Sequence, residues 1–346
     1  MLRNHRQEKT GYLGKIGVGL SRIAPKSRTS HTVEEEFSLP LFSVTVLLTL
    51  AGLGLGLKLL APHAVWETQI HAAWWKGLGV FVAVNLLDCF FEYFFHRYAL
   101  HKPVVPFLSR LYKQHTKHHG LTRIGRRRTA KGKEIPFIEN VYPMIAQEQK
   151  EASFFPWFSL AAFALTLTPL FILCQWLMPS WPWLSFSYAA LTGSMLLYEL
   201  LHAIEHWPFE TWMPLIEHPR WGWFWKKAYS FHLRHHAVIE CNESISGFFT
   251  LPIADLVFGT YVLPETLYVD GEEWAASKFR NPRPYAFIRW CDRTTNAIVK
   301  NRRERARKKK GLSAETAGRM EEEELMALTN PFVPGKQVSV VRSGLE

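Results

Sequence analysis

Residues 152–198 read ASFFPWFSLAAFALTLTPLFILCQWLMPSWPWLSFSYAALTGSMLLY, 47 residues without a single Asp, Glu, Lys or Arg. A helix that crosses a membrane takes about 20 apolar residues, so this stretch is long enough for two. Its middle, Pro-Ser-Trp-Pro at 179–182, holds residues that favour a turn. The pattern predicts a tight helical hairpin, with one span at about 155–178 and the next at about 183–201.

Two more apolar segments precede this hairpin. Residues 37–57 are uncharged and end before Lys58. Residues 73–95 are mostly apolar but include Lys76, Asp88 and Glu92, and the two acids need a partner or water inside a span. The sequence therefore predicts an all-α, polytopic membrane protein with about four transmembrane helices, arranged as two hairpins.

Positive charge is distributed unevenly between the connections. With four spans, both termini and the 97–150 connection lie on the same side of the membrane. Seven Lys or Arg fall in residues 1–36 and twelve in 97–150, against two in 58–76 and none in 179–182. Because Lys and Arg are retained on the cytosolic side, the termini and the 97–150 connection are expected there.

The composition excludes several classes of protein. A hydrophobic content of 48% and a charged content of 21% do not fit a collagen, a disordered chain or a disulfide-rich miniprotein. Four cysteines without a CxxC pair favour a reducing compartment. The net charge of +11 includes a basic run at 300–310, but that run lacks interleaved aromatic residues, so no nucleic-acid partner is expected. The predicted organisation is a cytosolic N-terminal segment (1–36), a membrane domain (37–270) and a cytosolic, partly disordered C-terminal extension (271–346).

Ten of the 15 histidines fall into four spaced groups. In order, the groups follow the patterns H-x4-H, H-x2-HH, H-x3-H and H-x2-HH, and they are His96 and His101; His115, His118 and His119; His202 and His206; His232, His235 and His236. Residues at i, i+3 and i+4 share one face of a helix, so each H-x2-HH directs three imidazoles the same way. The H-x4-H pair cannot share a face in a continuous α-helix, and Pro103 suggests that the chain turns back there.

All four histidine groups lie on the cytosolic side of the expected topology. A lone buried histidine is more often an ordinary core residue than a ligand, but four spaced groups on one membrane face point to metal. Ten imidazoles suit two ions, and neutral imidazole binds iron, zinc, copper or nickel. The other five histidines, including His63, His71 and His218, are interpreted as ordinary residues.

Four carboxylates are candidates for orienting the imidazoles by accepting an N–H bond. Asp88 and Glu92 precede His96 by eight and four residues, and Glu199 precedes His202 by three, so each shares a helix face with a histidine. Asp255 follows the last histidine group. The alternative for Asp88 and Glu92 is that they merely face water near the interface.

The order and spacing of these histidines over residues 75–265 resemble the fatty acid hydroxylase and sterol desaturase superfamily of integral-membrane di-iron oxygenases. The segment Phe-His-Arg-Tyr-Ala-Leu-His at 95–101 looks like the opening histidine box of that family, and Asn242 with 255–261 resembles its closing stretch. The basic stretch 120–157 departs from the pattern. It could shape a substrate entrance or contact anionic headgroups, or it could be a solvated loop.

The resemblance implies a cytosolic helical cap in which the ten histidines bind two iron ions. It implies a lipid substrate, fatty acyl, sphingolipid or sterol/isoprenoid in type, whose unactivated C–H bond is hydroxylated with O2. Electrons would come from NAD(P)H through a reductase and an external cytochrome b5- or ferredoxin-type donor. The expected location is the endoplasmic reticulum of a eukaryote or the inner membrane of a bacterium. Desaturation is the alternative within the family, and a metal-binding or transport protein is the alternative from a different class.

Overall fold

The structure, a computed structural model, describes residues 38–120, 122–128, 132, 134–140, 153–207, 209–263, 282–309 and 311. Side chains are described for these residues except at 122–128, 134–140 and 209–210. The predicted N-terminal segment 1–36 and the basic side chains of the 120–157 stretch lie outside this description.

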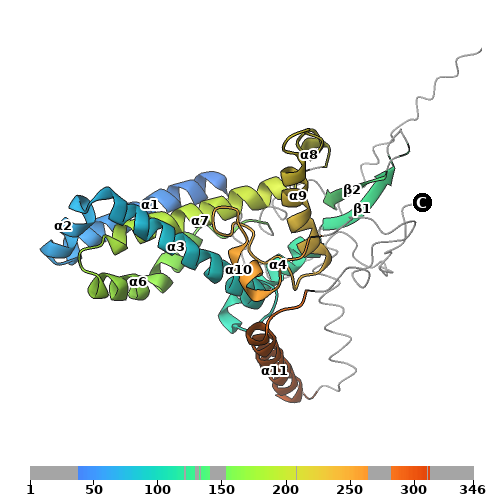
Figure 1. Ribbon diagram of the computed structural model, residues 1–346. Coiled ribbons are helices and arrows are strands. Elements are labelled where there is room, and N and C mark those ends of the chain that lie inside the picture. Colours follow the sequence, from blue (N-terminus) through green and yellow to red (C-terminus); the bar gives the residue numbers. More distant parts are fainter. Residues whose placement is uncertain are drawn as a thin grey trace, which may run out of the picture. The chain divides into compact units, whose positions relative to one another are not determined.

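Helices occur at all four predicted span positions (Figure 1). They are α1 (Leu39–Leu60), α3 (Trp74–Phe95), α6 (Ser159–Leu177) and α7 (Trp183–Glu205). Three are long and apolar enough to cross a membrane, namely α1, α6 and the continuous helical stretch Trp74–Leu100. The helix α7 is not among these three. It contacts α1, α3 and α6 and buries ten of its residues, so less of its surface has to be apolar.

A short helix, α2 (His63–His71), joins α1 to α3 and was not predicted. It places Gln69 against the turn between α6 and α7. The side-chain oxygen of Gln69 accepts hydrogen bonds from the Leu184 and Ser185 N–H groups, and that of Gln175 accepts one from the Trp183 N–H. These amides satisfy the first N–H groups of α7, which have no partner within a helix. The predicted turn at 179–182 is thereby fixed.

The helices α3 and α7 approach one another closely at Gly77. A Cβ atom built on Gly77 would lie 2.4 Å from the ring of Phe186, which is closer than real side chains allow. Hydrophobic clusters fill the contacts between these helices, for example Val80 and Val84 of α3 with Leu184 and Ala190 of α7. This packing fixes the end of α3 beside the end of α7, where two of the four histidine groups lie.

The remaining helices lie at that end of the spans (Figure 1). They are η1 (His96–Leu100), η2 (Pro106–Leu108), α4 (Ser109–Gly120), α8 (Phe209–Ile216), α9 (Gly222–Ala237), α10 (Ile253–Phe258) and α11 (Ala286–Lys309). We call α4, α8, α9 and α10 the cap. The 24-residue helix α11 was not predicted, and the predicted C-terminal extension contains it. Its residue Ile288 packs in one core cluster with Cys89 and Tyr93 of α3 and Ala254 of α10.

The all-α prediction is wrong in one respect, because the basic stretch contains an antiparallel hairpin. Strand β1 (Thr122–Arg128) pairs with β2 (Glu134–Asn140), with Ile124 opposite Ile138. β-Branched residues recur in both strands, and Gly132 between them has φ of 78°, a conformation that glycine adopts without strain. The hairpin lies beside α4, α8 and α9.

Candidate metal centre

All ten predicted histidines lie together, because the four helical segments that carry them converge at one end of the spans. His96 begins η1 and His101 directly follows it, whereas His202 lies in the last turn of α7 and His206 directly follows that helix. The two H-x2-HH triplets lie on α4 and α9. The side chains of all ten are at most partly exposed.

The first pair reaches the site by a π-helical turn. The N–H of His101 donates to the carbonyl oxygen of His96 at 3.1 Å, a bond that spans five residues. A turn of this width places residues five apart on the same side, and the two ring centroids lie 4.8 Å apart. The helix does end before Pro103, as predicted, but it is the π turn that brings His101 to the same site as His96.

Five imidazoles form the first group. Their ligand-type nitrogens all lie within 4.8 Å of one another, and they belong to His96, His101, His115, His119 and His235. The Nε2 atom of His115 lies 2.9 Å from that of His96, 3.2 Å from that of His101 and 3.1 Å from that of His119. One ring nitrogen carries at most one hydrogen, so hydrogen bonds among the rings cannot satisfy all these contacts.

Four imidazoles form the second group, with nitrogens again within 4.8 Å of one another: His118, His206, His232 and His236. The tenth histidine, His202, extends this group, because its Nε2 atom lies 3.0 Å from the Nε2 atom of His118. The two groups touch. The ring centroids of His119 and His236 are 4.2 Å apart, so ions bound in the two groups would be neighbours.

Backbone carbonyls fix the tautomers of three of these rings. The Nδ1–H of His96 donates to the Glu243 carbonyl at 2.7 Å, that of His235 to the Cys241 carbonyl at 2.8 Å, and that of His202 to the Ser153 carbonyl at 3.0 Å. A carbonyl oxygen can only accept, so the neutral rings present bare lone pairs at Nε2. Lone pairs converging in a buried space repel one another unless a cation lies between them. The donor set therefore fits metal ions.

Burial keeps the imidazoles neutral. Desolvation, followed by the neighbouring imidazoles, holds the pKa of His115, His118, His206 and His232 well below the usual value. Desolvation is also the main cause of the lowered pKa of His235. Metal binding needs the unprotonated ring, so at neutral pH no proton competes strongly for these nitrogens.

Two carboxylates that the sequence analysis overlooked lie near the ligand rings, one for each group. An oxygen of Glu243 lies 3.5 Å from the Nδ1 atom of His96, and an oxygen of Glu205 lies 3.5 Å from the Nδ1 atom of His232. Both carboxylates are buried. Glu205 directly precedes His206 and faces a histidine of another helix, so spacing along one helix could not reveal it.

The four predicted carboxylates bond to other groups instead. Asp88 accepts from the Ser194 hydroxyl, Glu92 from Ser246 and the Gly247 N–H, and Glu199 from the Phe155 N–H. Asp255 accepts from the Glu243 and Ser244 N–H groups. Of the four, only Asp255 supports a bond to an imidazole. It accepts from the N–H of the peptide group between Glu243 and Ser244, and the carbonyl oxygen of that same peptide group accepts from His96.

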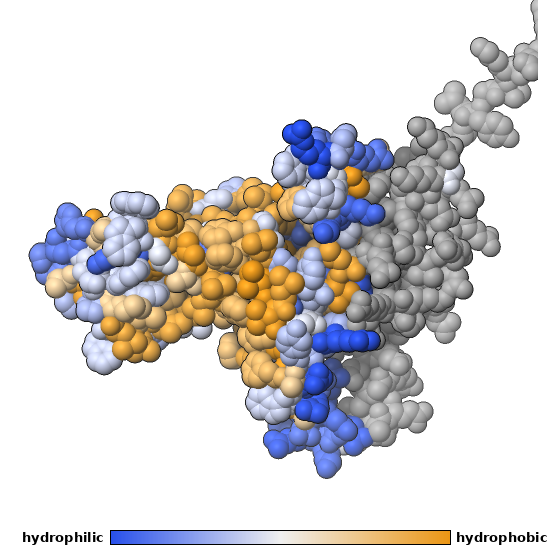
Figure 2. Space-filling view, viewed as in Figure 1, coloured by the Kyte–Doolittle hydropathy of each residue, from blue (hydrophilic) through white to orange (hydrophobic). Residues whose placement is uncertain are grey.

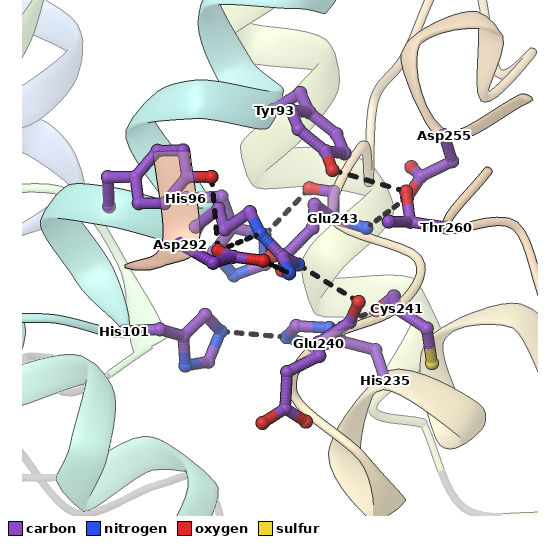
Figure 3. A network of polar contacts seen from close by, with 12 residues as sticks. Tyr93, His96, His101, His235, Glu240, Cys241, Glu243, Asp255, Thr260 and Asp292 are labelled. Carbon is purple, nitrogen blue, oxygen red and sulfur yellow. Dashed lines mark hydrogen bonds and ion pairs between the residues drawn. The ribbon is translucent and has the colours of Figure 1, made fainter. Parts of the chain in front are cut away.

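A buried polar network fastens this part of the site to α11 (Figure 3). The guanidinium of Arg97 donates to Glu243 at 2.8 Å and to the Glu240 carbonyl at 2.9 Å. It also makes a two-pronged pair with Asp292 of α11, at 3.0 and 2.8 Å. A bidentate pair of this kind is geometrically specific, so Arg97 fixes Glu243 next to His96.

A largely apolar pocket adjoins the first histidine group. It touches His96 and Leu100, and its other lining residues are Phe91, Phe95, Phe155, Phe163, Leu191, Met195 and Tyr198, with Asp88, Glu92, Ser194 and Ser246. Of the five aromatic residues near the end of α3, Phe91 and Phe95 line this pocket. The other three, Phe90, Tyr93 and Phe94, pack against Phe258.

Three of the histidines interpreted as ordinary lie away from the centre. His63 and His71 are exposed and pair with Glu67. His218 accepts hydrogen bonds from the Arg220 and Trp221 N–H groups. The remaining two, His5 and His31, lie outside the residues that the structure describes.

No protein-family model, no curated protein and no solved structure matches this chain. What the described residues define is a mostly helical protein with three candidate membrane spans and a buried histidine cluster that could bind metal.

Proposed function

We propose that the protein is an integral-membrane, non-haem di-iron oxygenase that hydroxylates an unactivated C–H bond of a lipid. The observation that carries the proposal is the convergence of two adjoining groups of neutral, buried imidazoles beside a largely apolar pocket. The spacing of the histidines, which resembles the fatty acid hydroxylase superfamily, supports the same function.

In this proposal each histidine group holds one iron ion, with His202 completing the second group. Imidazole binds several transition metals. Iron is proposed because an iron centre can use O2 to oxidise a C–H bond. Electrons would come from NAD(P)H through an external cytochrome b5- or ferredoxin-type donor and its reductase.

The protein itself would position the lipid substrate and exclude water. The pocket walls offer apolar contacts to the hydrocarbon chain of a lipid, and His96 and Leu100 mark where that lipid would meet the metal centre. The carbonyls of Glu243, Cys241 and Ser153 hold the ring orientations and the tautomers. Partners of this kind typically change metal affinity or activity by about 10–100-fold when they are removed.

The proposed topology has four spans, with α7 as the fourth beside α1, α3 and α6. Its central packing supports this, because a helix surrounded by others does not need a fully lipid-facing surface. The excess of Lys and Arg in 97–150 supports a cytosolic site. The corresponding membrane is the endoplasmic reticulum of a eukaryote or the inner membrane of a bacterium.

Oxidation of a lipid tests the proposal. Membranes that contain the protein are supplied with NADPH, a reductase with its electron carrier, and O2, and their lipids are analysed by mass spectrometry. Gain of an oxygen atom by one lipid is expected, whereas loss of two hydrogens would identify a desaturase. His119→Ala and His236→Ala should abolish the product, and the matched control His63→Ala should retain it. Metal analysis that finds less than one ion per chain would refute the di-iron assignment.

A further inference from the structure

The helix α11 has two exposed faces of opposite character. On one face, Phe287, Trp290, Thr294 and Ile298 recur at helical spacing, and Phe287, Trp290 and Ile298 are 53%, 56% and 42% exposed. On another face Arg289, Arg293, Asn296, Lys300 and Arg307 follow the same period. The helix carries nine Lys or Arg and two acids, Asp292 and Glu304.

The first turn of α11 packs against a candidate membrane span. Ile288 is buried against Cys89 and Tyr93, which belong to the candidate span Trp74–Leu100. The ring of Phe287 lies 6.3 Å from that of Phe94 in the same span. The exposed aromatic residues of α11 therefore begin beside apolar surface that would face lipid.

Three further contacts hold α11 at the end of that span. Asp292 binds Arg97 of η1, and Arg302 donates to the Pro103 and Val104 carbonyls at 2.8 Å each. Figure 1 shows α11 crossing the direction of the spans at this end. In Figure 2 the orange, apolar surface of the spans continues to the base of α11, where blue surface replaces it.

We propose that α11 lies in the membrane interface, with its aromatic face in lipid and its basic face on the headgroups of an anionic bilayer. An interfacial helix has an apolar face with Trp and Phe and a polar face rich in Lys and Arg. Attraction of the basic residues to anionic lipid adds to the apolar insertion and is weakened by salt.

A soluble acidic protein would also be attracted to the basic face. Such a partner would not explain why the exposed aromatic face of α11 continues the apolar surface of α3 and α10. In α10, Leu256 and Val257 are about half exposed. Continuity with the spans favours the bilayer as the occupant. The proposal does not depend on metal or on catalysis.

Two neighbouring exposed polar residues give a matched test. Thr294 lies on the aromatic face between Trp290 and Ile298, and Asn296 lies on the opposite, basic face. In a Cys174→Ser, Cys291→Ser background, Thr294→Cys and Asn296→Cys are each labelled with an environment-sensitive fluorophore. The full chain is then placed in nanodiscs of phosphatidylcholine, with or without phosphatidylserine, that contain a nitroxide-labelled lipid.

Nitroxide quenching and a blue shift are expected at 294 and not at 296, and phosphatidylserine should increase the quenching. The double variant Arg293→Glu, Lys300→Glu should lose this increase while keeping the quenching seen without phosphatidylserine. Equal, water-like emission at 294 and 296 in every nanodisc would overturn the proposal, as would quenching that is equal at both positions.

Discussion

Glu243 contacts the same ring nitrogen of His96 in two ways. Its backbone carbonyl accepts the Nδ1–H at 2.7 Å, and a side-chain oxygen lies 3.5 Å from that nitrogen. The side chain also receives Arg97 at 2.8 Å. A single residue thus sets the tautomer of His96 and places a carboxylate beside it.

Glu243→Gln should weaken metal binding to the first group by roughly tenfold, because the carbonyl contact remains while the carboxylate is lost. Metal retention during titration with a chelator measures the effect. Asp88→Asn is the matched control, since Asp88 is also buried but bonds to Ser194. Equal losses in both variants would contradict the role given to Glu243.

Each histidine group should bind its own ion. His115→Ala removes the ring at the centre of the first group, and His232→Ala removes one from the second, so each variant should keep about one of two ions. Elemental analysis of the purified protein gives the number, and exposed His71→Ala should keep both. Complete loss of metal in either variant would show instead that the two groups fill as one unit.

The metal-free protein should lose stability as the pH falls below about 6.5. Burial holds the folded-state pKa of His118, His232 and His235 well below the usual value. The unfolded chain therefore takes up protons first, and each such group costs at most about 1.4 kcal/mol per pH unit below 6.5.

Thermal unfolding of the metal-free protein in detergent, between about pH 7.5 and about pH 5.5, measures this loss. His232→Leu should reduce the slope, because it removes one of the titrating groups. A midpoint temperature that is constant or rises on acidification would contradict the predicted direction.

Filling the pocket should stop lipid oxidation without removing metal. Leu191 is 4% exposed and lines the pocket, whereas Leu196 on the same helix is 43% exposed. Leu191→Trp should lower product formation by at least about tenfold, at a packing cost of about 1–3 kcal/mol. Product analysis and metal content are measured together, and Leu196→Trp should behave as the unmodified protein.

Undiminished product from a metal-loaded Leu191→Trp variant would exclude this pocket as the substrate site. It would leave the histidine centre itself untouched.

The sequence predicted the site better than its surroundings. Apolar runs located α1, α3, α6 and α7 to within a few residues. The local spacing of the histidines indicated which of them share a helix face. Both signals are contained in single helices. Glu205 and Glu243 were missed because each serves a histidine on another element. The helix α11 was missed because its charges suggested a solvated tail. It packs through long-range contacts that no local pattern shows, among them those of Ile288 with Tyr93 and of Asp292 with Arg97.

The π turn at His96 has a consequence for comparing sequences. His96 and His101, five residues apart, have ring centroids 4.8 Å apart, and His202 and His206, four apart on an α-helix, have centroids 4.9 Å apart. The π turn contains one more residue than an α-helical turn, so both spacings place two imidazoles at about the same separation. A search pattern that fixes the number of intervening residues would separate chains whose sites are alike, whereas one that counts helical turns would group them.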